Sequence, residues 1–144
     1  MQTDLTIFYA DDDHEDLDFF REVTSTMSNI NLVTHNHGDA LFDALQNPPP
    51  SPQLIFLDLN MPGKNGFEIL RELKSKDKFK TIPVVIFSTS SDERNIELSM
   101  QMGASLYLPK LPEYESYKKS IQHTLSIDWK NFKPTRENFL YTAA

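Results

Sequence analysis

Acidic, hydroxyl and amino side chains stand at the ends of four short apolar segments of the chain. These residues are Asp11, Asp12, Asp13, Asp58, Ser88 and Lys110. Crowded carboxylates repel one another, and oxygen ligands without cysteine or histidine favour Mg²⁺. Lys110 can neutralise an incoming phosphate, Ser88 can donate a hydrogen bond to it, and Asp58 can act as the nucleophile that forms an aspartyl phosphate.

Helix or turn capping is the alternative explanation for these acids. Aspartate is favoured at the N-cap and in the first turn of a helix, and Asp58 taken alone could equally cap a neighbouring turn. One acid satisfies a cap, however, and the run from Asp11 to Asp13 exceeds that need. We therefore favour cation binding for the run, and the role of Asp58 depends on which other groups reach the same place.

The segments that carry these residues alternate between strand and helix patterns. Leu54–Leu57 and Val84–Phe87 are uninterrupted apolar runs, which are typical of strands covered on both faces of a parallel sheet. Further strands are predicted over 5–10, 31–35 and 106–109, and helices over 14–27, 39–45, 67–75, 92–102 and 112–125. This alternation predicts an α/β fold with helices on both faces of a parallel sheet, whose strands end at one common edge.

Bulk composition bounds the class of protein. The chain has 144 residues, 39% of them hydrophobic and 24% charged, which predicts a globular domain with an ordinary core. A net charge of −7 argues against a nucleic-acid-binding surface. The absence of cysteine excludes disulfides and thiolate chemistry. No signal peptide or membrane-spanning run is apparent, so we expect a cytoplasmic protein without membrane contact.

The last part of the chain follows a different pattern. We predict a main domain over 1–126 and an aromatic-rich C-terminal extension over 127–144. Trp129 and Phe132 are expected to cover an exposed apolar edge of the domain, and a partner-binding segment is the alternative. The proline-rich stretch 47–52 is expected to be a surface loop.

Four segments together resemble the receiver domain of two-component response regulators, the single-domain chemotaxis type in particular. They are Tyr-Ala-Asp-Asp-Asp at 9–13, Leu-Asp-Leu-Asn-Met-Pro-Gly-Lys-Asn-Gly at 57–66, Ser-Thr at 88–89 and Gly-Ala-Ser-Leu-Tyr-Leu-Pro-Lys at 103–110. The resemblance covers roughly Leu5 to Leu125. It implies a flavodoxin-like three-layer sandwich around a five-stranded parallel sheet of strand order 2-1-3-4-5.

The resemblance also implies roles for individual residues. It makes Asp58 the phosphoacceptor and Lys110 the lysine that contacts the phosphate. Ser88 and Tyr107 become the switch pair, in which the hydroxyl of Ser88 moves to the phosphoryl group. The implied Mg²⁺ ligands are Asp11 (through water), Asp12, Asp58 and the backbone carbonyl of Asn60.

One position departs from the family pattern. The family usually has proline directly after this lysine, whereas here Leu111 follows and Pro112 comes one step later. A cis bond before a residue other than proline costs about 3 kcal/mol. We therefore expect a trans Lys110–Leu111 bond, or else a strained cis bond held by the site.

Three functions compete on these grounds. The first is a stand-alone receiver that catalyses only its own phosphorylation and dephosphorylation, with a histidine kinase or phosphotransfer protein as donor and a downstream protein as target. The second is a phosphatase of the haloacid dehalogenase type, which needs a second aspartate where Asn60 stands. The third is a pseudo-receiver that is never phosphorylated, against which the complete set of Asp12, Asp58, Ser88 and Lys110 argues.

Overall fold

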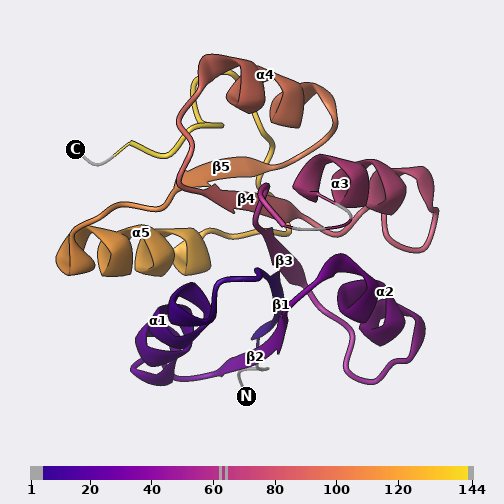
Figure 1. Cartoon of the computed structure of the whole chain (residues 1–144), viewed down its shortest axis with the longest axis horizontal. Coiled ribbons are helices and arrows are strands. Elements are labelled where there is room, and N and C mark those ends of the chain that lie inside the picture. Colours follow the sequence, from indigo (N-terminus) through magenta and orange to yellow (C-terminus); the bar gives the residue numbers. More distant parts are fainter. Residues whose placement is uncertain (1–4, 62, 64, 143–144) are drawn as a thin grey trace.

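The chain alternates strand and helix five times, as the sequence pattern predicts (Figure 1). The computed structural model describes residues 5–61, 63 and 65–142. The strands are β1 (Leu5–Ala10), β2 (Ile30–His35), β3 (Leu54–Leu57), β4 (Val84–Ser88) and β5 (Leu106–Pro109). The helices are α1 (His14–Ser25), α2 (Gly38–Gln46), α3 (Gly66–Ser75), α4 (Glu93–Gln101) and α5 (Tyr114–Ser126).

The five strands form one parallel sheet in the order β2-β1-β3-β4-β5. The predicted fold class and strand order are thereby confirmed. In the register of the sheet, Ala10 pairs with Leu57, Leu57 with Ile86, and Ile86 with Tyr107. The residues that follow β1, β3, β4 and β5 therefore meet at one edge of the sheet.

Alternate side chains of each strand enter two separate cores, because successive residues of a strand point to opposite faces. On the face covered by α1 and α5, the rings of Tyr9, Phe20, Phe56 and Phe87 lie 4.6–6.2 Å apart between centroids. The opposite face packs against α2, α3 and α4 through leucine and isoleucine side chains. This covering on both faces explains why β3 and β4 are apolar throughout.

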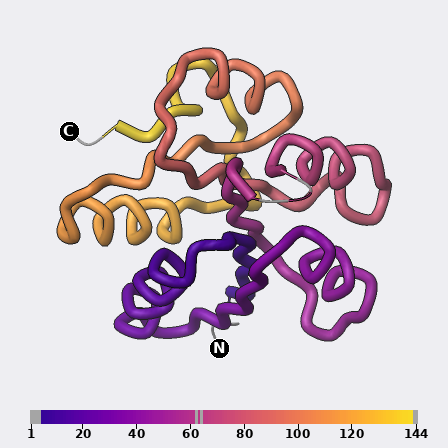
Figure 2. Tube along the Cα trace, in the orientation of Figure 1, coloured from indigo at the N-terminus to yellow at the C-terminus, as the bar shows by residue number. Residues whose placement is uncertain are grey.

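Residues 127–142 turn back along the domain after α5 (Figure 2). Trp129 is half-buried against the core under α1 and α5, and its indole nitrogen donates to the Thr124 carbonyl at 3.0 Å. Farther along, Leu140 forms a parallel bridge with Tyr107 of β5. The predicted domain boundary after residue 126 coincides with the end of α5 and stays a prediction. Residues 1–4 of the predicted main domain and residues 143–144 of the predicted extension lie outside the described residues.

No helix in the described part of the chain is both long enough and apolar enough to cross a bilayer.

Candidate functional site

Asp58 lies directly after β3, at the edge where the strands end. Its backbone N–H donates to the Ala10 carbonyl at 3.0 Å, and the residue is only 5% exposed. The chain then folds back so closely that a Cβ atom on Gly66 would lie 2.5 Å from the Asp58 carbonyl oxygen. Glycine at position 66 is therefore a steric requirement of the loop that holds Asp58.

Three carboxylates gather at this edge. Oxygen atoms of Asp11, Asp12 and Asp58 lie within 4.8 Å of one another, with Asp11 and Asp58 buried and Asp12 exposed. The third acid of the run has a different position, since Asp13 caps α1 by accepting from the backbone N–H groups of Glu15 at 2.9 Å and Asp16 at 3.3 Å. Capping thus explains Asp13, while the other two acids of the run lie beside Asp58.

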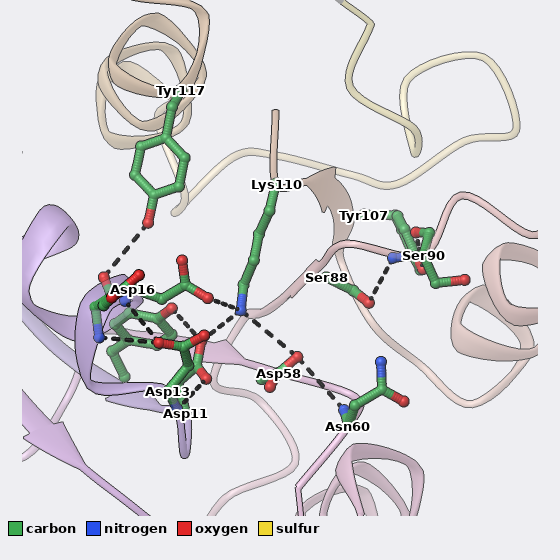
Figure 3. Close-up of polar contacts among 12 residues, drawn as sticks. Asp11, Asp13, Asp16, Asp58, Asn60, Ser88, Ser90, Tyr107, Lys110 and Tyr117 are labelled. Carbon is green, nitrogen blue, oxygen red and sulfur yellow. Dashed lines mark hydrogen bonds and ion pairs between the residues drawn. The ribbon is translucent and has the colours of Figure 1, made fainter. Parts of the chain in front are cut away.

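Lys110 reaches this cluster from the end of β5 (Figure 3). Its ammonium nitrogen lies 2.6 Å from Asp11, 2.8 Å from Asp16 and 3.8 Å from Asp58. Only 5% of the lysine side chain is exposed, so these ion pairs are shielded from water. The structure brings together the predicted site residues Asp11, Asp58 and Lys110.

Asp16 is a site residue that the sequence analysis missed. It stands in the first turn of α1, where an acid is common for electrostatic reasons alone. Its spacing in the sequence could have pointed to the site. Asp16 comes three residues after Asp13, so it lies near the start of the helix on the same side as Asp13. Its contact with Lys110 joins positions 94 residues apart, which helix spacing cannot reveal.

The electrostatics of the cluster favour a bound cation. The pKa of Asp58 is raised to about 7: burial is the main cause, the positive charge of Lys110 acts in the opposite direction, and the neighbouring carboxylate of Asp11 adds to the rise. Burial alone would lower the pKa of Lys110, but Asp11 and Asp58 outweigh it and the pKa is raised. The carboxylate oxygens of Asp11, Asp12 and Asp58 are ligands that suit a hard divalent cation. The positive charge of such an ion would favour the ionised form of Asp58.

Two tyrosines support the acids from the side of α1 and α5. The hydroxyl of Tyr9 donates to Asp11 at 2.5 Å, and that of Tyr117 donates to the Asp16 carbonyl at 3.4 Å. Burial and nearby carboxylates raise the pKa of both phenols, so both remain protonated donors. Tyr9 and Tyr117 therefore hold Asp11 and α1 in place without adding charge.

Ser88 and Tyr107 are linked through Ser90 (Figure 3). The backbone N–H of Ser90 donates to the Ser88 hydroxyl at 3.2 Å, and the Tyr107 hydroxyl donates to the Ser90 carbonyl at 2.7 Å. Ser88 and Tyr107 are both fully buried. The loop after β4 thus connects the edge where Asp58 lies with the aromatic ring on β5.

The remaining predicted features lie beside the cluster. The Asn60 backbone N–H lies 3.4 Å from a carboxylate oxygen of Asp58, while the metal-binding role of the Asn60 carbonyl stays a prediction. Within the described residues the cis peptide bonds are Pro48–Pro49 and Pro49–Pro50, so the Lys110–Leu111 bond is trans. Of the two alternatives expected at the position that departs from the family pattern, the structure has the trans bond.

Comparison with known proteins shows which family this chain resembles. Residues 7–122 match the family model described as the response regulator receiver domain. Response regulator Rcp1 of Synechocystis sp. is 34% identical over 123 residues, which cover 81% of this chain and 83% of Rcp1. Protein PilH of Pseudomonas aeruginosa is 33% identical over 95 residues, which cover 66% of this chain and 76% of PilH.

Solved structures agree with these matches. The Mn²⁺-bound form of response regulator Rcp1 superposes with a TM-score of 0.79 at 30% identity, covering 91% of this chain and 99% of that one. The phosphorylated cyanobacterial phytochrome response regulator RcpA gives a TM-score of 0.80 at 28% identity, covering 91% of this chain and 97% of that one. One neighbour thus carries a divalent metal and the other a phosphoryl group.

Proposed function

The chain belongs to the response regulator receiver family, and from this premise we propose that Asp58 accepts a phosphoryl group from a histidine kinase or a phosphotransfer protein. The observation that carries the proposal is the buried carboxylate of Asp58 beside two further acids and the ammonium group of Lys110. The family places the chain among signalling proteins rather than metabolic enzymes.

The acids and the lysine have different roles because their charges are opposite. Asp11, Asp12 and Asp58, with the Asn60 carbonyl, would hold Mg²⁺, which when bound neutralises charge on the phosphoryl oxygens. The Mn²⁺-bound form of Rcp1 supports a divalent ion in a relative, and the carboxylate donor set supports Mg²⁺ here. An ion between the carboxylates would also offset the burial and the repulsion from Asp11 that raise the pKa of Asp58.

The transfer exchanges one bond for another. A carboxylate oxygen of Asp58 attacks the phosphorus, the phosphorus–nitrogen bond of the phosphohistidine breaks, and the electron pair returns to the imidazole. Lys110 lies 3.8 Å from Asp58, which is close enough for its ammonium group to move onto a phosphoryl oxygen. Positioning and charge neutralisation account for most of the catalysis in such transfers.

The resulting phosphoryl group would change the loop after β4. Its oxygens offer acceptors to the Ser88 hydroxyl, and Ser88 is connected through Ser90 to the hydroxyl of Tyr107. A shift at Ser88 would therefore alter the packing between α4, β5 and α5. We propose that a downstream protein target recognises this altered surface.

The other two functions receive less support. Family membership and Asn60 at the position of a second aspartate leave the haloacid dehalogenase mechanism without a supporting observation. The pseudo-receiver lacks support because the acids and Lys110 lie around Asp58 as a phosphoacceptor site needs. The stand-alone arrangement stays a proposal, supported by Rcp1, of which this chain matches 83%.

Intact-mass measurement after incubation with acetyl phosphate and Mg²⁺ tests the proposal. We expect a single added phosphoryl group in the wild type and none in Asp58→Asn. Asp13→Asn is the matched control, because asparagine also caps helices well and Asp13 lies outside the carboxylate cluster. Labelling that persists in Asp58→Asn would show that another residue is the acceptor.

A further inference from the structure

The edge of β5 is occupied by a later part of the same chain, residues 135–141, which we name the C-terminal strap. The backbone N–H of Tyr107 donates to the Phe139 carbonyl at 2.8 Å, and the N–H of Tyr141 donates to the Tyr107 carbonyl at 2.9 Å. Leu140 is the bridge partner of Tyr107. The strap thus satisfies backbone groups that an edge strand would otherwise present to another chain.

Side chains attach the strap to the helices on both sides of β5. Phe139 is 1% exposed and joins the core between the sheet and α2, α3 and α4, with its ring centroid 6.5 Å from that of Tyr107. Arg136 forms two hydrogen bonds of 3.1 Å with Glu97 on α4, and the ring of Tyr141 lies 5.3 Å from that of His123 on α5. Since exposed ion pairs contribute little, burial of Phe139 is the main source of docking affinity.

Tyr107 is the residue that this strap shares with the phosphoacceptor site. Its backbone pairs with the strap, its ring contacts Phe139, and its hydroxyl donates to the Ser90 carbonyl beside Ser88. A Tyr107 side chain that left its buried position would lose both the contact with Phe139 and the bond to Ser90. Docking of the strap and burial of Tyr107 therefore stabilise each other.

We propose that the α4–β5–α5 face is an internal docking surface for the C-terminal strap, and that docking is coupled through Tyr107 to the occupancy of Asp58. This inference rests on the proposed function. A phosphoryl group that attracts Ser88 favours the buried Tyr107, and the buried Tyr107 favours the docked strap. Coupling between two sites is reciprocal: the factor by which a phosphate mimic at Asp58 strengthens docking of the strap equals the factor by which the docked strap strengthens binding of the mimic. Removing the strap contact must therefore weaken binding of the mimic.

The test measures the affinity of the full-length protein for beryllofluoride in the presence of Mg²⁺. Phe139→Ala removes the ring that contacts Tyr107, and we expect it to weaken binding by about fivefold or more. Phe132→Ala is the matched control, because Phe132 belongs to the same extension and its ring packs beside Trp129. Beryllofluoride should also slow amide hydrogen exchange at Tyr107 and Tyr141 in the wild type and not in Phe139→Ala.

A second variant keeps the test decisive if Phe139→Ala does not fold. Tyr141→Pro removes the N–H group that donates to Tyr107 while leaving Phe139 in place, and it should weaken beryllofluoride binding in the same direction. Equal affinities in the wild type and in the folded strap variants would overturn the coupling. A loss that depends on protein concentration would also overturn the proposal, since the strap would then dock on a second copy.

Failure of the proposed function gives a different result. If the wild type does not bind beryllofluoride at all, Asp58 is not a phosphoacceptor and the coupling has no basis. If the wild type binds it and Phe132→Ala and Phe139→Ala bind it equally well, the phosphoacceptor function stands and only the role of the strap is wrong.

Discussion

The ammonium group of Lys110 lies nearer to Asp16 than to Asp58. The two nitrogen–oxygen distances are 2.8 Å and 3.8 Å. Asp16 is held at the start of α1 by the Asp13 cap, and its carbonyl accepts a hydrogen bond from Tyr117. In this arrangement Asp16 competes with Asp58 for Lys110, the lysine that an incoming phosphoryl group would need under the proposed function.

Asp16→Asn should therefore strengthen the binding of an anionic phosphate mimic. The change removes one negative charge beside Lys110 and leaves its partner Asp11 in place. We expect beryllofluoride with Mg²⁺ to bind more tightly by about 1 kcal/mol, roughly fivefold, as judged from the Coulomb energy of one charge at this range. Asp18→Asn is the control, an exposed acid of the same helix. Equal gains in both variants would indicate a general charge effect rather than release of Lys110.

The raised pKa of Asp58 predicts how stability changes with pH in the absence of metal. The pKa rises from 3.8 to about 7 on folding, so between these values the folded state binds a proton that the unfolded state has lost. The stability contributed by protonated Asp58 is thus present below pH 3.8 and is lost as the pH rises through about 7. Mg²⁺ should reduce this loss because it favours the ionised carboxylate.

Thermal melting between pH 5 and 8, with EDTA or with Mg²⁺, measures this effect. Burial lowers the pKa of His35, which makes stability rise with pH and partly offsets the Asp58 effect. The informative quantity is therefore the difference between the wild type and Asp58→Asn. A wild-type curve in EDTA that runs parallel to that of Asp58→Asn would contradict the assignment.

The cluster of Asp11, Asp12 and Asp58 predicts stabilisation by Mg²⁺. A ligand that binds only the folded state at 100 times its dissociation constant adds about 2.7 kcal/mol to the free energy of unfolding. Asp12→Ala should flatten this response, because Asp12 supplies the exposed carboxylate of the cluster. Calorimetric melting across a Mg²⁺ series would check it, with Asp13→Asn as the comparison. An unchanged response in Asp12→Ala would exclude Asp12 as a ligand.

The connection from Ser88 to Tyr107 predicts a variant that is phosphorylated but does not switch. Ser88→Ala removes the hydroxyl that accepts from Ser90 and leaves Asp58 and Lys110 unchanged. We expect Asp58 to be labelled by acetyl phosphate, while beryllofluoride-induced NMR shifts at Tyr107 and in α4 shrink. Shifts of wild-type size at these distant positions would show that Ser88 does not transmit the signal.

Much of the site follows from local sequence. The apolar runs that become β3 and β4 predict strands buried on both faces, and parallel strands must end at one edge of a sheet. That rule alone places Asp11, Asp58 and Lys110 near one another, as the structure has them. Their residue types then suggest cation binding and phosphate chemistry, because charge and donor type are properties of each side chain.

Tertiary structure decided the arrangements that depend on contacts between distant elements. The acidic residues differ in role because of such contacts, since Asp13 caps α1 whereas Asp16 approaches Lys110. Phe139 is one of several aromatic residues in the extension, and only its packing beside Tyr107 distinguishes it from Phe132. Periodicity and turn signals report on neighbours within a few residues, whereas these contacts depend on how α1, β5 and the C-terminal strap are oriented in space.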